Sequence, residues 1–368
     1  MKTSKVYFTD MHITMEENIL QKLKRLIKTA GIDRIDFKKK YTAIKIHFGE
    51  PGNLAFLRPN FAKTVVDIVK ELGGKPYLTD CNTLYVGRRK DALEHLNTAY
   101  LNGFSPFSTG CHVLIGDGLK GTDEVLVPVV GGEYVKEAKI GRAIMDADVV
   151  ISLTHFKVHE ATGIGGTIKN IGMGCGSRAG KMEMHSSGKP QVSSKLCIGC
   201  GVCAKNCALG AITVANRKAL IDHNRCVGCG RCIGICQMDA VLPASDESNE
   251  ILCKKMSEYA WAVLRGRPSF HISLVIDVSP FCDCYGGNDI PIVPNVGMFA
   301  SFDPVALDVA CAEAVNRQPV MAGSLLEKNV SKNCDYFTAV HPETNWKIAI
   351  EHAVKLGLGT KDYELITV

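Results

Sequence analysis

The stretch ADVVISLTHFKVHEATGIGGTIKN, residues 147–170, decides the fold class of this chain. Its first ten residues are rich in apolar and β-branched side chains, which predicts a strand. Its last eight residues follow that strand and can begin a helix. Further β-rich runs lie at 5–10, 41–48, 75–80 and 271–280, and segments with a helical period lie at 56–74 and 303–315. Strands that alternate with helices predict an α/β protein with a layered, mainly parallel sheet.

Two cysteine arrays with the same spacing interrupt this pattern near the middle of the chain. They read CIGCGVCAKNC at 197–207 and CVGCGRCIGIC at 226–236. The spacing C-x2-C-x2-C-x3-C is the bacterial ferredoxin run for 4Fe-4S clusters, in which the fourth cysteine of each run binds the other cluster. The predicted ligands are Cys197, Cys200, Cys203 and Cys236 for one cluster, and Cys226, Cys229, Cys232 and Cys207 for the other.

The repeat resembles a two-cluster bacterial ferredoxin over roughly residues 195–243. The residues after each array repeat as well, and the glycines inside the arrays allow the backbone to approach a cluster closely. Zinc also takes cysteine ligands, but zinc ribbons use two separated C-x2-C knuckles. We therefore expect a small α+β ferredoxin domain at 191–245, inserted between two parts of a host domain, 1–190 and 246–368.

The composition excludes several function classes. Apolar residues make up 46% of the chain and charged residues 22%, and the net charge of +5 is spread without long basic blocks, so nucleic acid is not an expected partner. The sequence contains no apolar run of about 18 residues and no secretion signal at its start. Sixteen cysteines in such a chain favour reduced thiols that bind metal over disulfides. We expect a cytoplasmic protein with no membrane partner.

Unusual polar residues gather where the expected strands end. Ligands of α/β folds bind at the carboxyl ends of strands, so we expect four loops to surround one cleft. These loops carry Lys45, His47 and Glu50; Asp80, Cys81 and Asn82; His155, Lys157, His159, Lys169 and Cys175; and Asp277, Cys282, Asp283 and Cys284.

Histidine and lysine side chains are the candidate catalytic groups of this cleft. We expect His47, His155, Lys157 and His159 to supply protons to a bound small molecule. His155 and His159 are four residues apart, and metal binding, substrate contact and structural hydrogen bonding all remain open for them.

The glycine-rich segment GIGGTIKN, residues 163–170, is a candidate cofactor or anion site. A helix that begins here can offer free N–H groups to an anion at Gly163 and Gly165, and Lys169 can hold the same group. The segment is not a dinucleotide-binding fingerprint, because Ile168 stands where the third glycine is needed.

Four cysteines outside the arrays also fall at strand ends, namely Cys81, Cys175, Cys282 and Cys284. Four thiolates can hold a third cluster or another soft metal. One thiolate with a low pKa can instead act as a nucleophile, and buried free cysteines can simply be small apolar side chains. The sequence leaves these three alternatives open.

The stretches KIHFGE, LTDCNTLY, VISLTHFKVHEATGIGGTIKNIGMGC and NVGMFASFDPVALDVA resemble the family called domain of unknown function 362. The resemblance covers nearly the whole chain and implies a redox-linked iron-sulfur protein; it supplies no catalytic residues. With the cysteine arrays, it leads to the hypothesis of a reductase that passes electrons from two 4Fe-4S clusters to a small molecule in the cleft.

A non-catalytic electron carrier or maturation factor for a partner enzyme is the alternative function. Either function needs a redox partner protein as electron donor or acceptor. Basic residues near the arrays can dock an acidic partner: Arg217, Lys218, Arg225 and Arg231.

Overall fold

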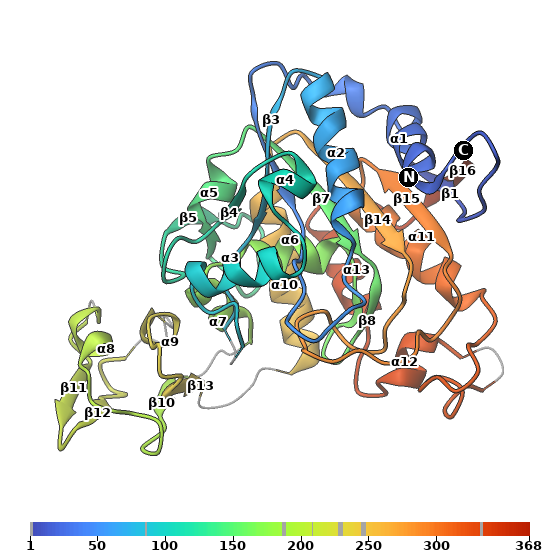
Figure 1. Cartoon of the computed structure of the whole chain (residues 1–368). Helices are drawn as coiled ribbons and strands as arrows, with labels where there is room; N and C mark the ends of the chain where they lie inside the picture. Colours follow the sequence, from blue (N-terminus) through green and yellow to red (C-terminus); the bar gives the residue numbers. More distant parts are fainter. Residues whose placement is uncertain are drawn as a thin grey trace.

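The computed structural model describes residues 3–84, 87–185, 189–207, 209–226, 231–243, 248–331 and 334–368 (Figure 1). An eight-stranded sheet forms its centre. In spatial order its strands are β16 (Tyr363–Thr367), β1 (Ser4–Thr9), β15 (Gly297–Ser301), β14 (Ser269–Val275), β7 (Val149–His155), β2 (Tyr41–Lys45), β3 (Lys75–Asp80) and β4 (Val113–Ile115). All five β-rich runs of the sequence are strands of this sheet.

The sheet is mostly parallel. The five strands from β14 to β4 all run parallel to their neighbours. β15 lies antiparallel between β14 and β1, and β16 returns parallel to β1. The expected α/β class with a mainly parallel sheet is therefore confirmed, and the antiparallel β15 is an addition that the sequence pattern did not indicate.

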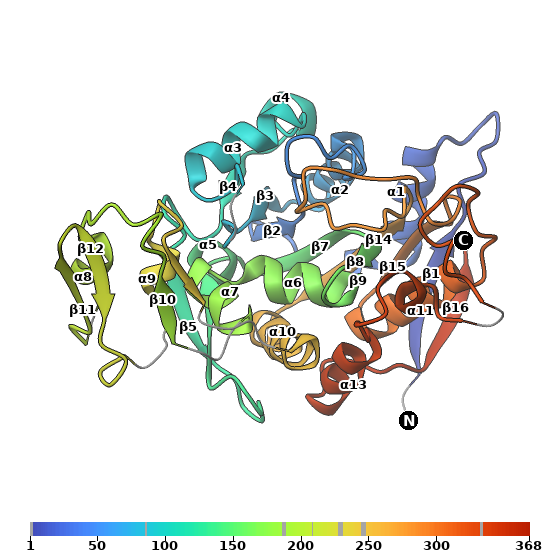
Figure 2. The same cartoon turned by 90° about the horizontal axis from the view of Figure 1, so that it is seen from below.

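Helices cover both faces of the sheet (Figure 2). One face carries α1 (Ile19–Thr29), α2 (Pro59–Glu71), α3 (Ala92–Leu101) and α4 (Pro106–Thr109), and the other carries α6 (Thr167–Cys175), α10 (Asn249–Leu264), α11 (Pro304–Asn316) and α13 (Lys347–Lys355). The smaller elements are η1 (Ile32–Arg34), α5 (Arg142–Met145), α7 (Arg178–His185), α12 (Tyr336–Val340), the hairpin β5 (Glu124–Pro128) with β6 (Glu137–Gly141), and the hairpin β8 (Lys157–His159) with β9 (Gly163–Gly165).

The central strand β7 illustrates why this sheet needs two helical layers. Val149, Ile151 and Leu153 pack into the apolar cluster beneath α1 and α2. Val150 points to the opposite face and joins the cluster that includes α6, α10 and α11. Because side chains alternate along a strand and every residue of β7 is buried, both faces must be covered.

Two helix boundaries follow from local sequence. The side chain of Asp303 accepts hydrogen bonds from the backbone N–H groups of Val305 and Ala306, both at 2.9 Å, and Pro304 takes the first position of α11. This is the N-terminal arrangement that the sequence indicates. α2 ends at Glu71 because Gly73 adopts a left-handed φ of +84°.

Residues 189–243, the cysteine segment, form a lobe at one end of the sheet (Figure 1). The lobe contains β10 (Pro190–Val192), α8 (Val202–Lys205), β11 (Ile212–Ala215), β12 (Lys218–Ile221), α9 (Arg231–Gly234) and β13 (Val241–Pro243). β10 pairs antiparallel with β13, so the two ends of the segment lie side by side. Among the described residues, no helix combines the length and apolar character needed to cross a membrane.

Candidate functional site

A cavity of about 490 Å³, the main cavity, lies at the carboxyl ends of β2, β3 and β7. His47 follows β2, Asp80 ends β3, and His159 ends the β8 strand that follows β7. Cys284, on the loop after β14, completes the wall. The structure thus brings residues from all four of the expected loops to one cavity.

A buried ion pair lies at the wall of the main cavity. The ammonium of Lys45 lies 2.9 Å from the carboxylate of Asp80, and both side chains are almost fully buried. Lys45 also donates to the amide oxygen of Asn170 at 2.8 Å. Burial opposes ionisation of Asp80, but Lys45 and neighbouring cations hold the pKa of this carboxyl well below its usual range.

Arg89 is a cavity residue that the sequence reasoning missed. Its Nε donates to Glu50 at 2.7 Å, and its Nη1 lies 3.0 Å from Nε2 of His47. Among the described residues, its buried Nη2 has no hydrogen-bond partner. A buried donor without a partner costs about 1–3 kcal/mol, which an oxygen of a bound ligand can offset. The only sequence signal was the basic run RRK soon after the β3 strand end.

His47 lines the main cavity as a neutral group. Burial and the charge of Arg89 hold the pKa of His47 well below its usual value. The expected role of His47 as an acid that delivers a proton therefore needs adjustment, because the structure favours the unprotonated imidazole.

His155 and Lys157 meet Asp283 behind the main cavity, not at its surface. Nδ1 of His155 lies 2.9 Å from Oδ2 of Asp283, and the Lys157 ammonium lies 3.1 Å from the same oxygen. Nε2 of His155 faces the carbonyl of Ile276 at 2.8 Å. Burial opposes ionisation of Asp283, but His155 and Lys157 hold its pKa well below the usual range. Both expected catalytic residues thus anchor the loop that carries Asp283, and they line a small cavity of about 40 Å³.

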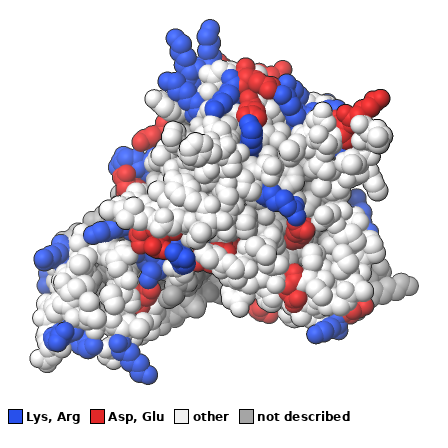
Figure 3. All heavy atoms as spheres, in the orientation of Figure 1, with Lys and Arg blue, Asp and Glu red and all other residues white. Residues whose placement is uncertain are grey.

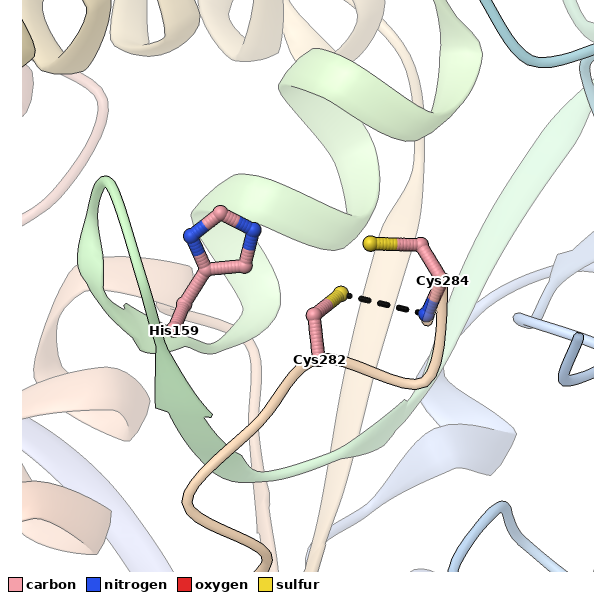
Figure 4. A group of neighbouring side chains, drawn as sticks. All are labelled: His159, Cys282 and Cys284. Atoms are coloured by element: carbon pink, nitrogen blue, oxygen red, sulfur yellow. Dashed lines mark hydrogen bonds between the residues drawn. The ribbon is translucent and has the colours of Figure 1, made fainter. Parts of the chain in front are cut away.

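His159, Cys282 and Cys284 form a compact group at the main cavity (Figure 4). Each offers one potential metal-binding atom, and these atoms lie within 4.8 Å of one another. The ammonium of Lys169 lies 3.4 Å from the sulfur of Cys282, and the backbone N–H of Cys284 donates to the same sulfur at 3.4 Å. Lys169 and the backbone of Cys284 thus both donate to the sulfur of Cys282.

The electrostatics of this group separate its two thiols. The hydrogen bond from Cys284 and the charge of Lys169 lower the pKa of Cys282. Together they outweigh burial, and the pKa lies well below its usual value. The same hydrogen bond, with burial, raises the pKa of Cys284. Burial and Lys169 lower the pKa of His159, so its imidazole is neutral. These opposite shifts favour the thiolate at Cys282 over a thiolate at Cys284.

The glycine-rich segment does not offer free N–H groups to an external anion. α6 begins at Thr167, as the sequence indicated, but the N–H groups of Thr167 and Ile168 donate to the carboxylate of Asp308 at 2.6 and 2.9 Å. Gly163, with a φ of +74°, packs against Trp346, and Gly165 lies over the side chain of Lys157. The helix start is occupied by the protein's own carboxylate, which corrects the expected anion site at these glycines.

Cys81 and Cys175 are separate from the Cys282 group. Both are buried in the apolar core, where the Cys81 thiol donates to the Cys175 carbonyl. Burial raises the pKa of both thiols, that of Cys175 to about 12. The structure therefore divides the four cysteines into two pairs, and Cys81 of the buried pair also lines the main cavity.

Four cysteines of the cysteine segment line a second cavity, of about 240 Å³. They are Cys197, Cys200, Cys203 and Cys236. The backbone N–H of Ala219 donates to the sulfur of Cys197 at 3.4 Å. Hydrogen bonds to sulfur are one of the levers by which proteins tune iron-sulfur clusters, so these residues fit such a group.

The second cysteine set is described in part. Cys207, Cys226 and Cys232 lie within the described residues, and Cys229 lies outside them. The backbone N–H of Ala211 donates to the sulfur of Cys207 at 3.2 Å.

A family model described as "Domain of unknown function (DUF362)" matches residues 42–313 of the chain. The chain belongs to the DUF362 family. The DUF362 match begins in β2 and ends in α11, so it includes the main cavity and runs across the cysteine segment.

Three known proteins show weaker similarity to this DUF362 protein. A thylakoid-associated protein of Synechocystis sp. is 28% identical over 131 residues, which are 34% of this chain and 35% of that protein. The chain thus matches about a third of the length of that relative. A structural-genomics crystal structure from Thermotoga maritima has a TM-score of 0.42 at 12% identity, covering 96% of this chain and 87% of that one. The lactate racemase apoprotein of Thermoanaerobacterium thermosaccharolyticum has a TM-score of 0.35 at 11% identity, covering 74% and 51%.

Proposed function

We propose that this protein is an iron-sulfur oxidoreductase whose cysteine segment holds two 4Fe-4S clusters and whose main cavity binds the small molecule that is reduced. The observation that carries the proposal is the shared cavity of Cys197, Cys200, Cys203 and Cys236. This is the ligand set expected for one cluster from array spacing alone, and three of its members are separated from the fourth by more than thirty residues. Such clusters transfer single electrons at low potential.

Contacts between the cysteine segment and the host support a short path for electrons. Leu84 lines the main cavity and also belongs to the apolar cluster that contains Cys197 and Cys203. Next to the cavity residue Arg89, Lys90 forms an ion pair with Asp239 of the cysteine segment. The host segments at Leu84 and at Arg89–Lys90 therefore contact both the cysteine segment and the main cavity.

Charges at the main cavity favour an anionic acceptor. Arg89, Lys169 and Lys181 line it. Among the described residues, Nη2 of Arg89 has no hydrogen-bond partner, so it can donate to a ligand. Lys181 donates to the carbonyl of Gly176 at 2.6 Å. A guanidinium is well suited to bind a carboxylate or phosphate, so we expect the substrate to carry one of these groups.

The first test is the metal content of protein purified without oxygen. Two clusters require about eight iron atoms and as many acid-labile sulfides per chain. Replacement C200S should lower both values, whereas the control C334S, at a half-buried cysteine outside the arrays, should retain them. Stoichiometric zinc without labile sulfide would refute the proposal.

Exposed apolar side chains keep the electron carrier as a second candidate function. On the face shown in Figure 3, the surface of the cysteine segment is largely uncharged between a few basic side chains. Its exposed apolar residues include Leu196, Ile198, Leu209, Val214, Leu220 and Met238. Such residues suit docking to a partner protein. Two of the basic residues expected to dock are engaged within the segment, because Lys218 donates to the carbonyl of Cys197 and Arg225 to that of Leu209.

Reoxidation kinetics separate the two functions. After reduction by dithionite, reoxidation by a small-molecule substrate should saturate with its concentration, because the cavity binds it. A rate that responds to a partner protein and never saturates with a small molecule would favour the carrier.

A further inference from the structure

The loop Cys282-Asp283-Cys284 is built to present two sulfurs together. The side chain of Asp283 is fully buried and held by His155 and Lys157. Its carbonyl accepts the backbone N–H of Glu50 at 2.9 Å. Because the central residue is fixed through its side chain and its carbonyl, the flanking Cys282 and Cys284 are held close to each other (Figure 4).

The tautomer of His159 decides what this group can bind. Nδ1 of His159 accepts hydrogen bonds from the backbone N–H groups of Ala161 and Thr162, at 3.1 and 3.2 Å. A neutral imidazole with an accepting Nδ1 carries its proton on Nε2. The other ring nitrogen faces the two sulfurs (Figure 4), so Nε2–H points at them as a donor.

This arrangement suits a thiolate better than a metal ion. A histidine that binds metal through one nitrogen donates a proton from the other, and His159 has the opposite polarity. The ammonium of Lys169 lies 3.4 Å from the sulfur of Cys282, where it attracts a thiolate and repels a metal cation. Three N–H donors, from Lys169, His159 and the backbone of Cys284, thus converge on the sulfur of Cys282.

The two sulfurs also differ in access. Cys282 is fully buried, whereas Cys284 is exposed and lines the main cavity. A substrate in the cavity therefore meets Cys284 first, with Cys282 directly behind it. This is the order of a nucleophilic thiol followed by a resolving thiol.

We infer that Cys282 and Cys284 are a redox-active pair that cycles between dithiol and disulfide and reduces a small disulfide bearing an anionic group in the main cavity. The inference rests on the proposed function for its electrons, because reduced clusters of the cysteine segment are the reductant that regenerates the dithiol.

The steps balance in atoms and electrons. The Cys284 proton moves to Cys282, and the Cys284 thiolate attacks one sulfur of the substrate R–S–S–R′. A mixed disulfide forms, and R′S⁻ leaves and takes the proton from Cys282. The Cys282 thiolate then attacks the sulfur of Cys284, which forms the protein disulfide and releases RS⁻, protonated from water. Two electrons and one proton then convert the protein disulfide back to the Cys282 thiolate and the Cys284 thiol.

Lys169 sets how easily the pair is oxidised. A partner that stabilises the thiolate stabilises the reduced form and makes a disulfide more oxidising. Removing the ammonium should therefore make the pair easier to oxidise. The midpoint of oxidation is expressed as the concentration of oxidised glutathione divided by the square of the concentration of reduced glutathione. We expect this midpoint to be about tenfold lower in K169M than in the wild type. The control K63M, at an exposed lysine of α2, should match wild type.

The test is an anaerobic titration of the full-length protein with glutathione mixtures. Acid quenching, alkylation and mass spectrometry then report the state of the peptide that carries Cys282 and Cys284. The wild-type peptide should lose both alkylation sites together and carry an internal disulfide with no bound glutathione. C284S cannot form that disulfide, so its peptide should carry at most one glutathione. A peptide that keeps both sites at every ratio would overturn the inference, as would a stoichiometric soft metal that C282S no longer binds.

This titration does not depend on iron. If the disulfide forms in protein that lacks iron and labile sulfide when purified without oxygen, the proposed function fails and the dithiol pair stands. If the protein holds about eight irons but never forms the disulfide, the pair fails and the proposed function stands.

Discussion

Replacement of Asp283 by Asn should strongly destabilise the host and expose the thiol loop. Asp283 contacts a buried histidine and a buried lysine, with His155 Nδ1 at 2.9 Å and Lys157 Nζ at 3.1 Å from its Oδ2. The side chains of all three residues are at most 7% exposed. D283N keeps the shape of the side chain and removes its charge, so the buried Lys157 ammonium loses its counter-ion.

The magnitude follows from the cost of breaking a buried pair. At an effective dielectric constant of about 20, a charge pair near 3 Å contributes on the order of 5 kcal/mol before desolvation is subtracted. Removing one partner of a buried pair typically costs about 3–5 kcal/mol, because the other charge stays buried. We therefore expect the free energy of unfolding to fall by about 3–5 kcal/mol in D283N.

Tryptophan fluorescence during urea unfolding measures this change. The chain has two tryptophans, Trp261 and Trp346, and both lie outside the cysteine segment, so the signal reports the host. The control D67N removes a carboxylate from an exposed pair with Lys63 and should cost less than about 1 kcal/mol. The double variant D283N/K157M should recover part of the loss. A fall of less than about 1 kcal/mol in the free energy of unfolding of D283N would refute the argument that Asp283 holds its loop through the buried ion pair.

Three further predictions concern packing, pH and cluster retention. G172A should destabilise the host by about 1–3 kcal/mol, because a Cβ there would lie 2.1 Å from the backbone oxygen of Met256 and force α6 away from α10; urea unfolding measures the change. Burial lowers the pKa of His271 to about 3. As the pH falls below about 6.5, the unfolded chain therefore binds a proton before the folded protein does, and the free energy of unfolding declines. In H271N this decline between about pH 6 and 4 should be shallower by roughly 1.4 kcal/mol per pH unit. G199A should reduce the iron content, because its φ is +71° and a Cβ would lie 2.5 Å from the backbone of Arg217.

Each of these three has its own check. An unchanged unfolding free energy in G172A would mean that α6 and α10 do not approach as closely as described. Parallel stability curves for H271N and wild type would show that His271 titrates normally in the folded state. For G199A, the control G131A has a similar φ of +84° with no atom within 4 Å of the new Cβ, so it separates backbone strain from crowding. Full iron retention in G199A would contradict the crowding argument.

Local patterns in the sequence were sufficient for five strands of the sheet and for one group of four cysteines that share a cavity. The strand β7 could be predicted because burial on both faces requires a continuous apolar run, and the start of α11 because Asp303 and Pro304 satisfy a helix N-terminus locally. The spacing within the arrays anticipated that Cys236 would join Cys197 at one cavity. These features depend on residues close in sequence or on a repeat with known geometry.

Only the tertiary structure decided the chemistry of the main cavity. Buried charges pair with whatever counter-charge the fold brings near, at any separation in sequence. Asp283 contacts His155, which lies 128 residues earlier in the sequence, and Asp308 accepts from the N-terminus of α6, which lies about 140 residues earlier. Arg89 is held at the cavity by its hydrogen bond to Glu50. The sequence by itself thus determined five strands of the sheet and one group of four cysteines. The packing of distant loops decided which side chains are charged, which are covered, and which sulfur faces the cavity.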